Sequence, residues 1–344
     1  MAGSLERIAR RLGVSVSTVS RALAGKPGVS ARRRAEIRAL AQEMGCVLNP
    51  HASSLRRRRG TGLTLVSAFR PSRIGAMRHH ALMAAARREF DPVRAVVIAE
   101  DEPLDQVVRE AASRCPQAIV ISSVGGTVED ATLALLKREA IALVAMDCAI
   151  PGADTVRVDR VSGMYQAARL LLLSGCKDAV FFSRGGLSQP DARIQGIRLA
   201  YQSLDYDPDT VSLVPVCSDG FAAGYQAAAD CLRRRPADGI FAYDDELAVG
   251  ALRAVQDAGL RSPHDVRVIG FDNLPMTAYL ACPLTTVAQP VEPVSETVVD
   301  VCRQRLQDPA APARSTSLRT ELVVRASAPL PTNVARTRVF ETPS

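Results

Sequence analysis

Residues 5–24 read LERIARRLGVSVSTVSRALA, and this stretch predicts two short helices joined by a tight turn. Apolar side chains recur every three or four residues over 5–12, which is one face of a helix. Gly13 suits the end of that helix, and Ser15 can cap the next one by accepting a backbone N–H. The outward face of the second helix is small, polar and basic, which suits a helix laid into a DNA major groove. The alternative is a solvated amphipathic hairpin that is merely rich in arginine.

A third helix is predicted over residues 31–44, between a capping Ser30 and Gly45. Its apolar stripe is sufficient to complete a three-helix core with the first two helices. Residues 46–60 then read CVLNPHASSLRRRRG, which contains four consecutive arginines. These arginines either strengthen sequence-independent contact with phosphates or form a solvated linker.

Two motifs in this region are specific. VSVSTVSRALAGKPGVS begins at Val14 and NPHASSL begins at Asn49. Together they resemble the lac repressor–galactose repressor family of bacterial transcription regulators, whose pattern is V-S-x-x-T-V-S-R and then N-P-x-A-x-x-L in a hinge. The resemblance implies a helix-turn-helix DNA-binding headpiece over residues 1–48, with a hinge helix and linker over 49–61.

The resemblance also implies which side chains contact DNA. The base-reading positions hold Val16, Ser17 and Arg21. The phosphate-contacting positions hold Ser15, Thr18 and Ser20. The hinge adds Asn49, Ala52 and Leu55, of which Leu55 is expected to wedge into the minor groove and kink the operator. Ala24 stands where the family usually has Asn, so one polar contact is missing.

The charge of the chain is unevenly distributed. The 344 residues carry a formal net charge of +7, and residues 1–60 hold thirteen Arg or Lys against three acids. The first sixty residues therefore carry +10 and the remainder carries −3. A basic head on a slightly acidic body indicates a polyanion partner for the head alone. The length and an apolar fraction of 47% allow two or three domains with large cores.

Several classes of protein and site are disfavoured. No apolar run is long enough to span a bilayer and no apolar signal region lies near Met1, so a cytoplasmic protein without a membrane partner is expected. The eight cysteines are scattered without C-x-x-C spacing, which predicts buried free thiols. The four histidines show no metal-binding spacing, so no metal and no cofactor are expected.

From Gly62 onward, strand-like runs alternate with helix-length segments. Strands are expected at 63–69, 95–99, 118–124, 141–146, 179–183, 211–216, 239–242 and 266–271, with a last strand at 317–324. Helices are expected at 105–114, 128–138, 162–173, 192–204, 220–233, 245–258 and 291–307. Continuous apolar strands alternating with helices predict parallel sheets covered on both faces. Eight strands in two sets of four indicate two similar subdomains.

This part of the chain resembles the same family, whose body is like a periplasmic sugar-binding protein: two α/β lobes joined by three crossing strands. The signatures are VRVD at 156–159, RIQG at 193–196, YDDELAVGAL at 243–252, VIGFDN at 268–273 and PLTT at 283–286. The resemblance covers about residues 1–326. The fold expected is therefore α plus α/β: a three-helix headpiece with a hinge helix, then a two-lobed, periplasmic-binding-protein-like α/β body.

The resemblance assigns residues 62–328 to an effector-binding and dimerisation domain. The first lobe is expected over about 62–158 and 287–316, and the second over about 159–286 and 317–328. The tail, 329–344, is rich in Pro and Thr and is expected to be disordered. No heptad repeat follows the body, so a homodimer is expected rather than a tetramer.

Ligands of open α/β sheets bind beyond the carboxyl ends of the strands. The polar residues expected there are Arg70, Glu100, Ser122, Ser123, Asp147, Arg184, Asp219, Asp244 and Asp272. A carboxylate at such a position can accept two hydroxyl hydrogen bonds from a polyol. Arg193 opens a helix of the second lobe and can donate in a fork.

The resemblance selects Asp147, Arg193, Asp244 and Asp272 as effector contacts and places Phe221 where an aromatic ring stacks on the ligand. A strand-end Asp is often only a helix cap, which is the alternative for Asp244, and Phe221 is alternatively plain core. We add Arg70 and Ser122 as effector contacts from their strand-end positions.

One segment departs from the family pattern. Residues 68–80 read AFRPSRIGAMRHH where relatives carry an Asn-Pro-Phe-Phe-like segment, and Asp244 replaces a usual Asn. Arg70 and Arg73 make this wall of the first lobe basic, which favours a sugar acid or a sugar phosphate as effector. A neutral sugar, a nucleoside, or a decayed pocket that binds nothing are the alternatives.

The function expected is a sequence-specific DNA-binding regulator, in the first instance a repressor, that binds a pseudo-palindromic operator as a dimer. A small sugar-like effector between the lobes modulates its affinity by binding the two lobe arrangements differently. The alternatives are a small-molecule-binding protein without DNA regulation and a regulator with a decayed pocket. No catalytic residues are expected, because G-x-G-x-x-G, Walker, G-x-S-x-G and H-E-x-x-H motifs are all absent from the sequence.

Overall fold

The computed structural model describes residues 2–23, 28–43, 60–68, 72–99, 102–184, 191–234, 237–332 and 339–340. The chain divides into two units, Met1–Gly60 and Thr61–Ser344, each with its own core. Residues 44–59, which include Asn49, Ala52 and Leu55 of the expected hinge, lie outside the described residues.

The first unit is a three-helix headpiece, as the sequence predicted. Its helices are α1 (Ala2–Leu12), α2 (Val16–Leu23) and α3 (Ala31–Glu43). Ser15 begins α2 as expected, because its Oγ accepts the backbone N–H of Thr18 at 3.1 Å. The core of this unit combines one apolar face from each helix: Ile8, Ala9, Val19, Ala22, Ile37, Leu40 and Ala41.

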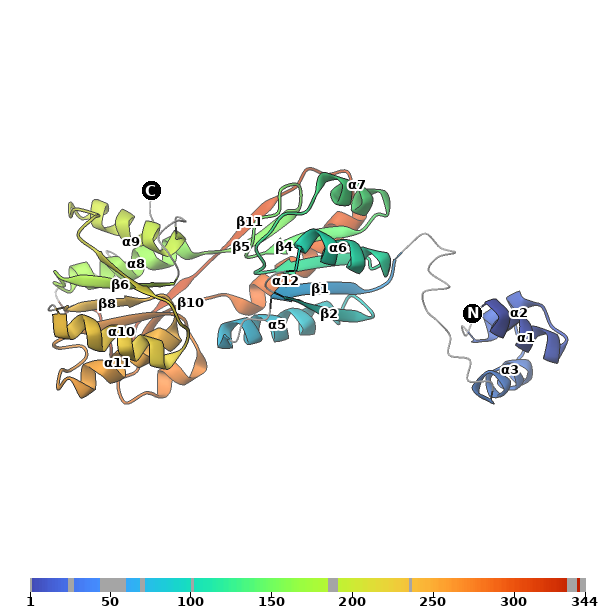
Figure 1. The fold of residues 1–344 in the computed structure, drawn as a ribbon, viewed down its shortest axis with the longest axis horizontal. Coiled ribbons are helices and arrows are strands. Elements are labelled where there is room, and N and C mark those ends of the chain that lie inside the picture. Colours follow the sequence, from blue (N-terminus) through green and yellow to red (C-terminus); the bar gives the residue numbers. More distant parts are fainter. Residues whose placement is uncertain are drawn as a thin grey trace. The chain divides into compact units, whose positions relative to one another are not determined.

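The second unit contains two six-stranded sheets that form two lobes (Figure 1). The first sheet has the order β11-β5-β4-β3-β1-β2. Its strands are β1 (Leu63–Ala68), β2 (Val93–Ile98), β3 (Ala118–Ser122), β4 (Ala142–Met146), β5 (Asp154–Asp159) and β11 (Ser315–Arg319). The second sheet has the order β12-β10-β9-β8-β6-β7. Its strands are β6 (Ala179–Arg184), β7 (Ser212–Val216), β8 (Gly239–Ala242), β9 (Arg267–Asp272), β10 (Thr285–Ala288) and β12 (Glu321–Val323).

The expectation of two sets of four strands is wrong, because each sheet has six. The sequence analysis missed β5 and β10 as strands. β10 reads TTVA, and its threonine hydroxyls are buried in hydrogen bonds, with Thr286 Oγ1 donating to Asp245 Oδ1 at 2.5 Å. A strand whose buried groups are polar but paired does not show the apolar pattern on which the prediction relied.

The chain crosses between the lobes three times, after β5, after β10 and between β11 and β12. The expected last strand, 317–324, is divided at Thr320, whose Oγ1 donates to the Asp159 carbonyl at 2.9 Å. β11 stays paired with β5 through Arg319, three residues beyond the expected lobe boundary at 316. The second crossing lies at Gln289 and Pro290, beyond the boundary expected at 286, because β10 belongs to the second sheet.

Helices cover both faces of each sheet, as expected for parallel sheets (Figure 1). They are α5 (Arg73–Ala86), α6 (Leu104–Ser113), α7 (Asp130–Arg138), α8 (Arg160–Leu173), α9 (Ala192–Ser203), α10 (Phe221–Arg234), α11 (Asp245–Asp257), α12 (Val291–Gln307) and the short η1 (Pro275–Tyr279). The sequence analysis did not expect α5. Ser72 caps this helix by accepting the Gly75 N–H at 3.1 Å, and α5 packs beside α12.

The expectation that the tail, residues 329–344, is disordered is wrong for those of its residues that the structure describes. Val339 is completely buried in the core of the second lobe, and Leu330 and Phe340 pack against the same core. Apolar side chains spaced along a Pro-rich segment therefore suffice to dock it.

Two further expectations concern exposure. Cys115 and Cys217 are exposed, so the expectation of buried thiols is wrong for them, although all described cysteines are free. Among the described residues, every helix is too short or too polar to span a membrane.

Candidate functional site

The α2 helix presents a polar face opposite its core contacts. Val19 and Ala22 are completely buried, whereas Ser15, Ser17 and Arg21 are exposed. The Ser15 hydroxyl lies 2.8 Å from that of Thr18 and 3.1 Å from that of Ser17, which holds these side chains together at the start of the helix. Val16 and Thr18 are partly buried, and the side chain of Ser20 lies outside the description. The helix is thus anchored on one face and offers hydroxyl and guanidinium groups on the other.

A residue that the sequence analysis passed over fixes the turn before α2. Arg33 on α3 donates through Nη2 to the carbonyl of Leu12 at 2.8 Å, at the carboxyl end of α1. Its Nη1 donates to Glu36 at 2.9 Å. Because Leu12 directly precedes the Gly13 turn, Arg33 ties the third helix to the end of the first.

The second candidate site is a cavity of about 1050 Å³ between the two lobes. It opens at the carboxyl ends of strands from both sheets, where ligands of α/β proteins bind. Five of the expected effector contacts line it: Ser122, Asp147, Arg193, Asp244 and Asp272. Arg70 lies outside the described residues.

Phe221 is not among the residues that line the cavity. Its ring lies 4.7 Å from the guanidinium carbon of Arg73, a cation–π contact from the first lobe to the second. Arg73 also forms an ion pair with Glu246 at the start of α11. The aromatic ring expected to stack on a ligand therefore contacts an arginine of α5.

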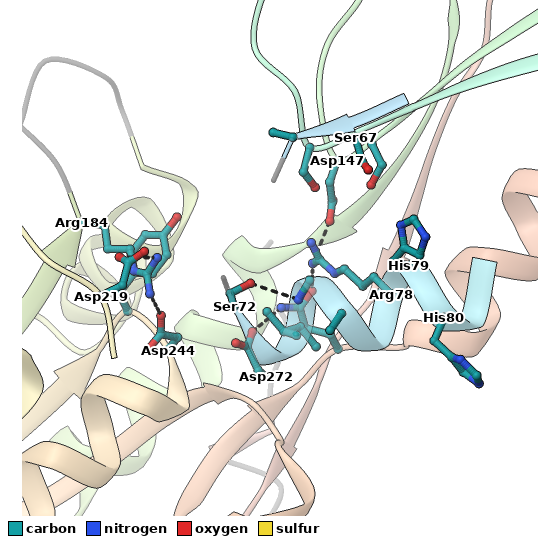
Figure 2. Close-up of a pocket in the computed structure, with 18 of the residues that line it drawn as sticks. Ser67, Ser72, Arg78, His79, His80, Asp147, Arg184, Asp219, Asp244 and Asp272 are labelled. Atoms are coloured by element: carbon teal, nitrogen blue, oxygen red, sulfur yellow. Dashed lines mark hydrogen bonds and ion pairs between the residues drawn. The ribbon is translucent and has the colours of Figure 1, made fainter. Parts of the chain in front are cut away.

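In the first lobe, Asp147 lies directly after β4 with a left-handed φ of 55° and a side chain only 2% exposed. Arg160 forms a bidentate contact with the Asp147 carboxylate, with Nη1 3.2 Å from Oδ1 and Nη2 2.9 Å from Oδ2. Arg78 Nη2 lies 2.7 Å from Oδ2 on another side (Figure 2). Burial raises the pKa of Asp147, but the charges of Arg78 and Arg160 outweigh burial and hold the pKa below its usual value.

In the second lobe, Arg184 at the end of β6 lies between two carboxylates (Figure 2). Its Nη1 is 2.7 Å from Asp219 and its Nη2 is 2.5 Å from Asp244. Asp244 also caps α11 by accepting the Leu247 N–H at 2.9 Å. The capping contact proposed as an alternative for Asp244 is therefore present, and its second oxygen faces Arg184 at the cavity wall.

Arg193 and Asp272 lie deeper. The Arg193 guanidinium is stacked 3.9 Å from the Tyr243 ring centre and 4.4 Å from that of Phe271, and its buried Nε has no hydrogen-bond partner among the residues that the structure describes. Asp272 has a φ of 115°, which is strained for any residue except glycine, and it accepts a hydrogen bond from Gln289. Burial raises the pKa of Asp272 to about 7. Strained backbone and unpartnered buried groups concentrate at functional sites.

The sequence analysis missed Arg78, Arg160 and Gln289 as cavity residues. Arg78 lies on the unexpected helix α5, inside the segment that departs from the family pattern. Ser72 was the available signal, since a capping Ser before an Ala-rich stretch predicts a helix whose second turn carries Arg78. Arg160 directly follows the VRVD signature and was readable as the first residue beyond a strand.

Among the described residues, no group of three His, Cys, Asp or Glu side chains could hold a metal ion. The cavity is lined by guanidinium groups, carboxylates and the serine hydroxyls of Ser67, Ser122 and Ser123. These are the groups that bind hydroxylated and charged small molecules.

Comparison with known proteins places both units. Residues 4–49 match the family of bacterial regulatory proteins named lacI, and residues 168–328 match the periplasmic binding protein-like domain. The lactose operon repressor of Rhizobium radiobacter is 39% identical over 110 residues, which span 31% of this chain and 96% of that relative. The chain belongs to the LacI family of bacterial transcription regulators.

LacI-family relatives also match along nearly the whole chain. The regulator MalR of Streptomyces coelicolor is 28% identical over 340 residues, 95% of this chain and 97% of that relative. The regulator DegA of Bacillus subtilis is 28% identical over 294 residues, 83% of this chain and 86% of that relative. The lac repressor dimer bound to operator shares the fold, with a TM-score of 0.74 and 19% identity over 94% of this chain and 98% of that one. This LacI-family chain is a DNA-binding transcription regulator.

Proposed function

We propose that the protein is a repressor that binds a pseudo-palindromic operator as a homodimer, and that a sugar-like effector in the interlobe cavity modulates this affinity. The observation that carries the proposal is the pair of binding surfaces on one chain. One is the exposed face of α2 with Ser17 and Arg21, and the other is the cavity lined by Asp244, Asp272 and Arg193.

The chemistry of the cavity supports a hydroxylated effector. The carboxylates of Asp244 and Asp272 can accept hydrogen bonds from hydroxyl groups, and the guanidinium group of Arg193 lines the same cavity as a donor. Among structures with the same fold, one LacI-family regulator from Enterococcus faecium was solved with ribose and the regulator CelR with cellobiose. These two are 24% identical to this chain, with TM-scores of 0.65 and 0.64.

The architecture supports control through lobe movement. The lobes are joined by three crossings near Asp159, Gln289 and Thr320, and the cavity walls come from both sides. An effector that contacts both walls binds one lobe arrangement more tightly than another, and only this difference in affinity can alter DNA binding.

We propose binding rather than turnover in this cavity. Among the described residues, Asp147, Asp219 and Asp244 pair with guanidinium groups and Asp272 accepts from the Gln289 amide, so His79 and His80 form no carboxylate–histidine pair with them. We also propose that the protein acts in the cytoplasm, where the chromosomal DNA lies.

The test of the proposal begins with selecting the operator from random duplexes, followed by affinity measurements on the selected and a scrambled duplex at fixed salt. We expect Arg21→Ala to reduce the preference for the selected duplex about tenfold or more, because a base-reading arginine contributes about 1–3 kcal/mol of discrimination. The matched control is Arg32→Ala on α3, which removes the same charge from a side chain 92% exposed. Arg32→Ala should weaken both duplexes equally, and an unchanged preference in Arg21→Ala would exclude α2 as the reading helix.

A further inference from the structure

The first-lobe end of the cavity holds an excess of buried positive charge. Arg78 and Arg160 both pair with Asp147, and their side chains are only 12% and 20% exposed. Arg78 also donates to the side-chain oxygen of Gln289, a neutral group. Two guanidinium groups therefore share one carboxylate in a poorly hydrated place, which leaves one positive charge uncompensated.

Among the residues that the structure describes, neighbouring groups do not remove this excess. Among the described residues, Arg193 makes a long ion pair of 3.8 Å with Asp191 alone, and its buried Nε has no hydrogen-bond partner. Asp272 is the nearest further carboxyl group, but burial raises its pKa to about 7, so it is only partly ionised at neutral pH. Burial likewise lowers the pKa of Arg78, and the charge of Arg160 adds to this effect.

We infer that the effector carries an anionic group, a carboxylate or a phosphate, which binds at Arg78 and Arg160 beside Asp147. This inference rests on the proposed function of the cavity as the effector site. Guanidinium groups bind both kinds of oxyanion through charge-assisted hydrogen bonds. Ser67, Ser122 and Ser123 line the same cavity and supply hydroxyl donors for the remaining oxyanion oxygens.

The opposite wall fixes the orientation of the ligand. There Arg184 is already paired with Asp219 and Asp244, so this three-group cluster has a negative excess, while Arg193 lies apart from it, stacked on Tyr243 and Phe271. A carboxylate wall repels an anion and accepts hydrogen bonds from hydroxyl groups. The ligand therefore places its acid toward Arg78 and Arg160 and its hydroxylated part toward Asp244.

The first experiment uses inorganic phosphate and sulfate as probes on the full-length protein. We expect either anion to raise the melting temperature saturably above chloride at matched ionic strength, because a ligand of the folded state stabilises it. Arg78→Met should weaken the apparent anion affinity about tenfold or more, while Asp147 keeps its pair with Arg160. The matched control is Arg198→Met on α9, where the side chain is 48% exposed and paired with Asp209.

Each result of the phosphate and sulfate experiment either supports the anion site or overturns it. A response to phosphate and sulfate that is lost in Arg78→Met and kept in Arg198→Met supports the anion site. A response equal to that of chloride, or one that Arg78→Met leaves unchanged, overturns it. Circular dichroism of each variant at the start of the melt shows whether the variant has folded, and Arg160→Met repeats the test at the second guanidinium group.

The second experiment compares hexoses, their uronic acids and their 6-phosphates, in melting and in operator binding. Tighter binding of the uronic acid or of the 6-phosphate identifies the source of the anion. A neutral hexose that binds best, and alters operator binding, overturns the anionic inference but leaves the proposed effector function intact. If anions bind through Arg78 but every ligand leaves operator affinity unchanged, the anion site stands. The proposed effector function then fails.

Discussion

In the first lobe one carboxylate, Asp147, lies between two guanidinium groups, whereas in the second lobe one guanidinium group, Arg184, lies between two carboxylates. These two three-group clusters therefore have opposite excess charge, and Arg193 of the second lobe belongs to neither of them. They also differ in hydration, because the Asp147 side chain is 2% exposed and that of Asp219 is 47% exposed. Water screens the excess charge of the second wall far more than that of the first.

This difference teaches where a bound ligand contributes most. On the second wall solvent already stabilises the extra carboxylate, so a ligand hydroxyl replaces water there. On the first wall only a bound anion can balance the extra guanidinium group. The same kind of three-group cluster thus gives one wall that tolerates hydroxyl groups and another that selects for charge. Four predictions separate these contributions, and we order them by expected effect.

The largest effect is expected from Asp147→Asn, which leaves Arg78 and Arg160 buried without a counterion. Removal of one partner of a buried ion cluster costs about 3–5 kcal/mol, so the free energy of unfolding should fall by about 4 kcal/mol. Asparagine tolerates the left-handed φ of this position, so the backbone is not the cause of the loss. Urea unfolding measures the change, and Asp219→Asn on the hydrated wall serves as control with an expected loss below about 1 kcal/mol. Equal losses in the two variants would contradict the asymmetry.

The second prediction concerns the pH dependence that Asp272 imposes. Its pKa is raised from 3.8 to about 7 in the folded protein, so the folded state binds a proton more tightly than the unfolded state. The free energy of unfolding should therefore fall as pH rises from about 4 to about 7, by about 3 kcal/mol from this group.

Asp272→Asn should flatten that slope, because the amide does not titrate. The comparison is made with the wild type by urea unfolding at each pH. Asp245 contributes a slope of the same sign in both proteins, since burial raises its pKa well above the usual value. Identical slopes in the two proteins would show that Asp272 is ionised throughout.

The sequence predicted the headpiece and the alternation of the body because those segments follow simple periodicity. Apolar residues at helical spacing, Ile8 and Ile37 among them, form the headpiece core. The helix α12 begins and ends at the residues expected. The prediction failed where polar groups are buried in pairs. The sequence of β10 is typical of a polar loop. Its threonines are buried only because the fold brings Asp245 and Ser327 into hydrogen-bonding contact with them.

The cavity was predictable only in part for the same reason. Acids after apolar strands identified Asp147, Asp244 and Asp272 as cavity residues, since strand ends converge at one edge of a sheet. The partners of those acids come from elements distant in sequence: Arg78 meets Asp147 from α5, and Arg184 meets Asp244 from β6. Pairing between such positions depends on three-dimensional packing and leaves no local pattern.

The third substitution, Arg184→Met, tests the hydrated wall. It leaves Asp244 without its arginine, but Asp244 keeps the hydrogen bond to the Leu247 N–H and Asp219 stays near water. The expected loss in unfolding free energy is about 1–2 kcal/mol, smaller than for Asp147→Asn because less charge becomes stranded. Ligands bearing hydroxyl groups should still bind. A loss as large as that of Asp147→Asn would show that both walls are equally shielded from solvent.

The smallest effect is expected where the two walls meet outside the cavity, at the ion pair of Arg73 with Glu246. The Arg73 side chain is 54% exposed although that of Glu246 is only 7% exposed, and an ion pair with one partner in water contributes about 0.2–1 kcal/mol. A double-mutant cycle with Arg73→Met and Glu246→Gln should give a coupling of about 0.5 kcal/mol that shrinks between about 0.1 M and 1 M salt. The stacking of Arg73 on Phe221 persists at high salt, so Arg73→Met should retain a residual cost that Glu246→Gln does not share. A coupling above about 2 kcal/mol would mean that this contact holds the lobes together more strongly than an exposed pair can.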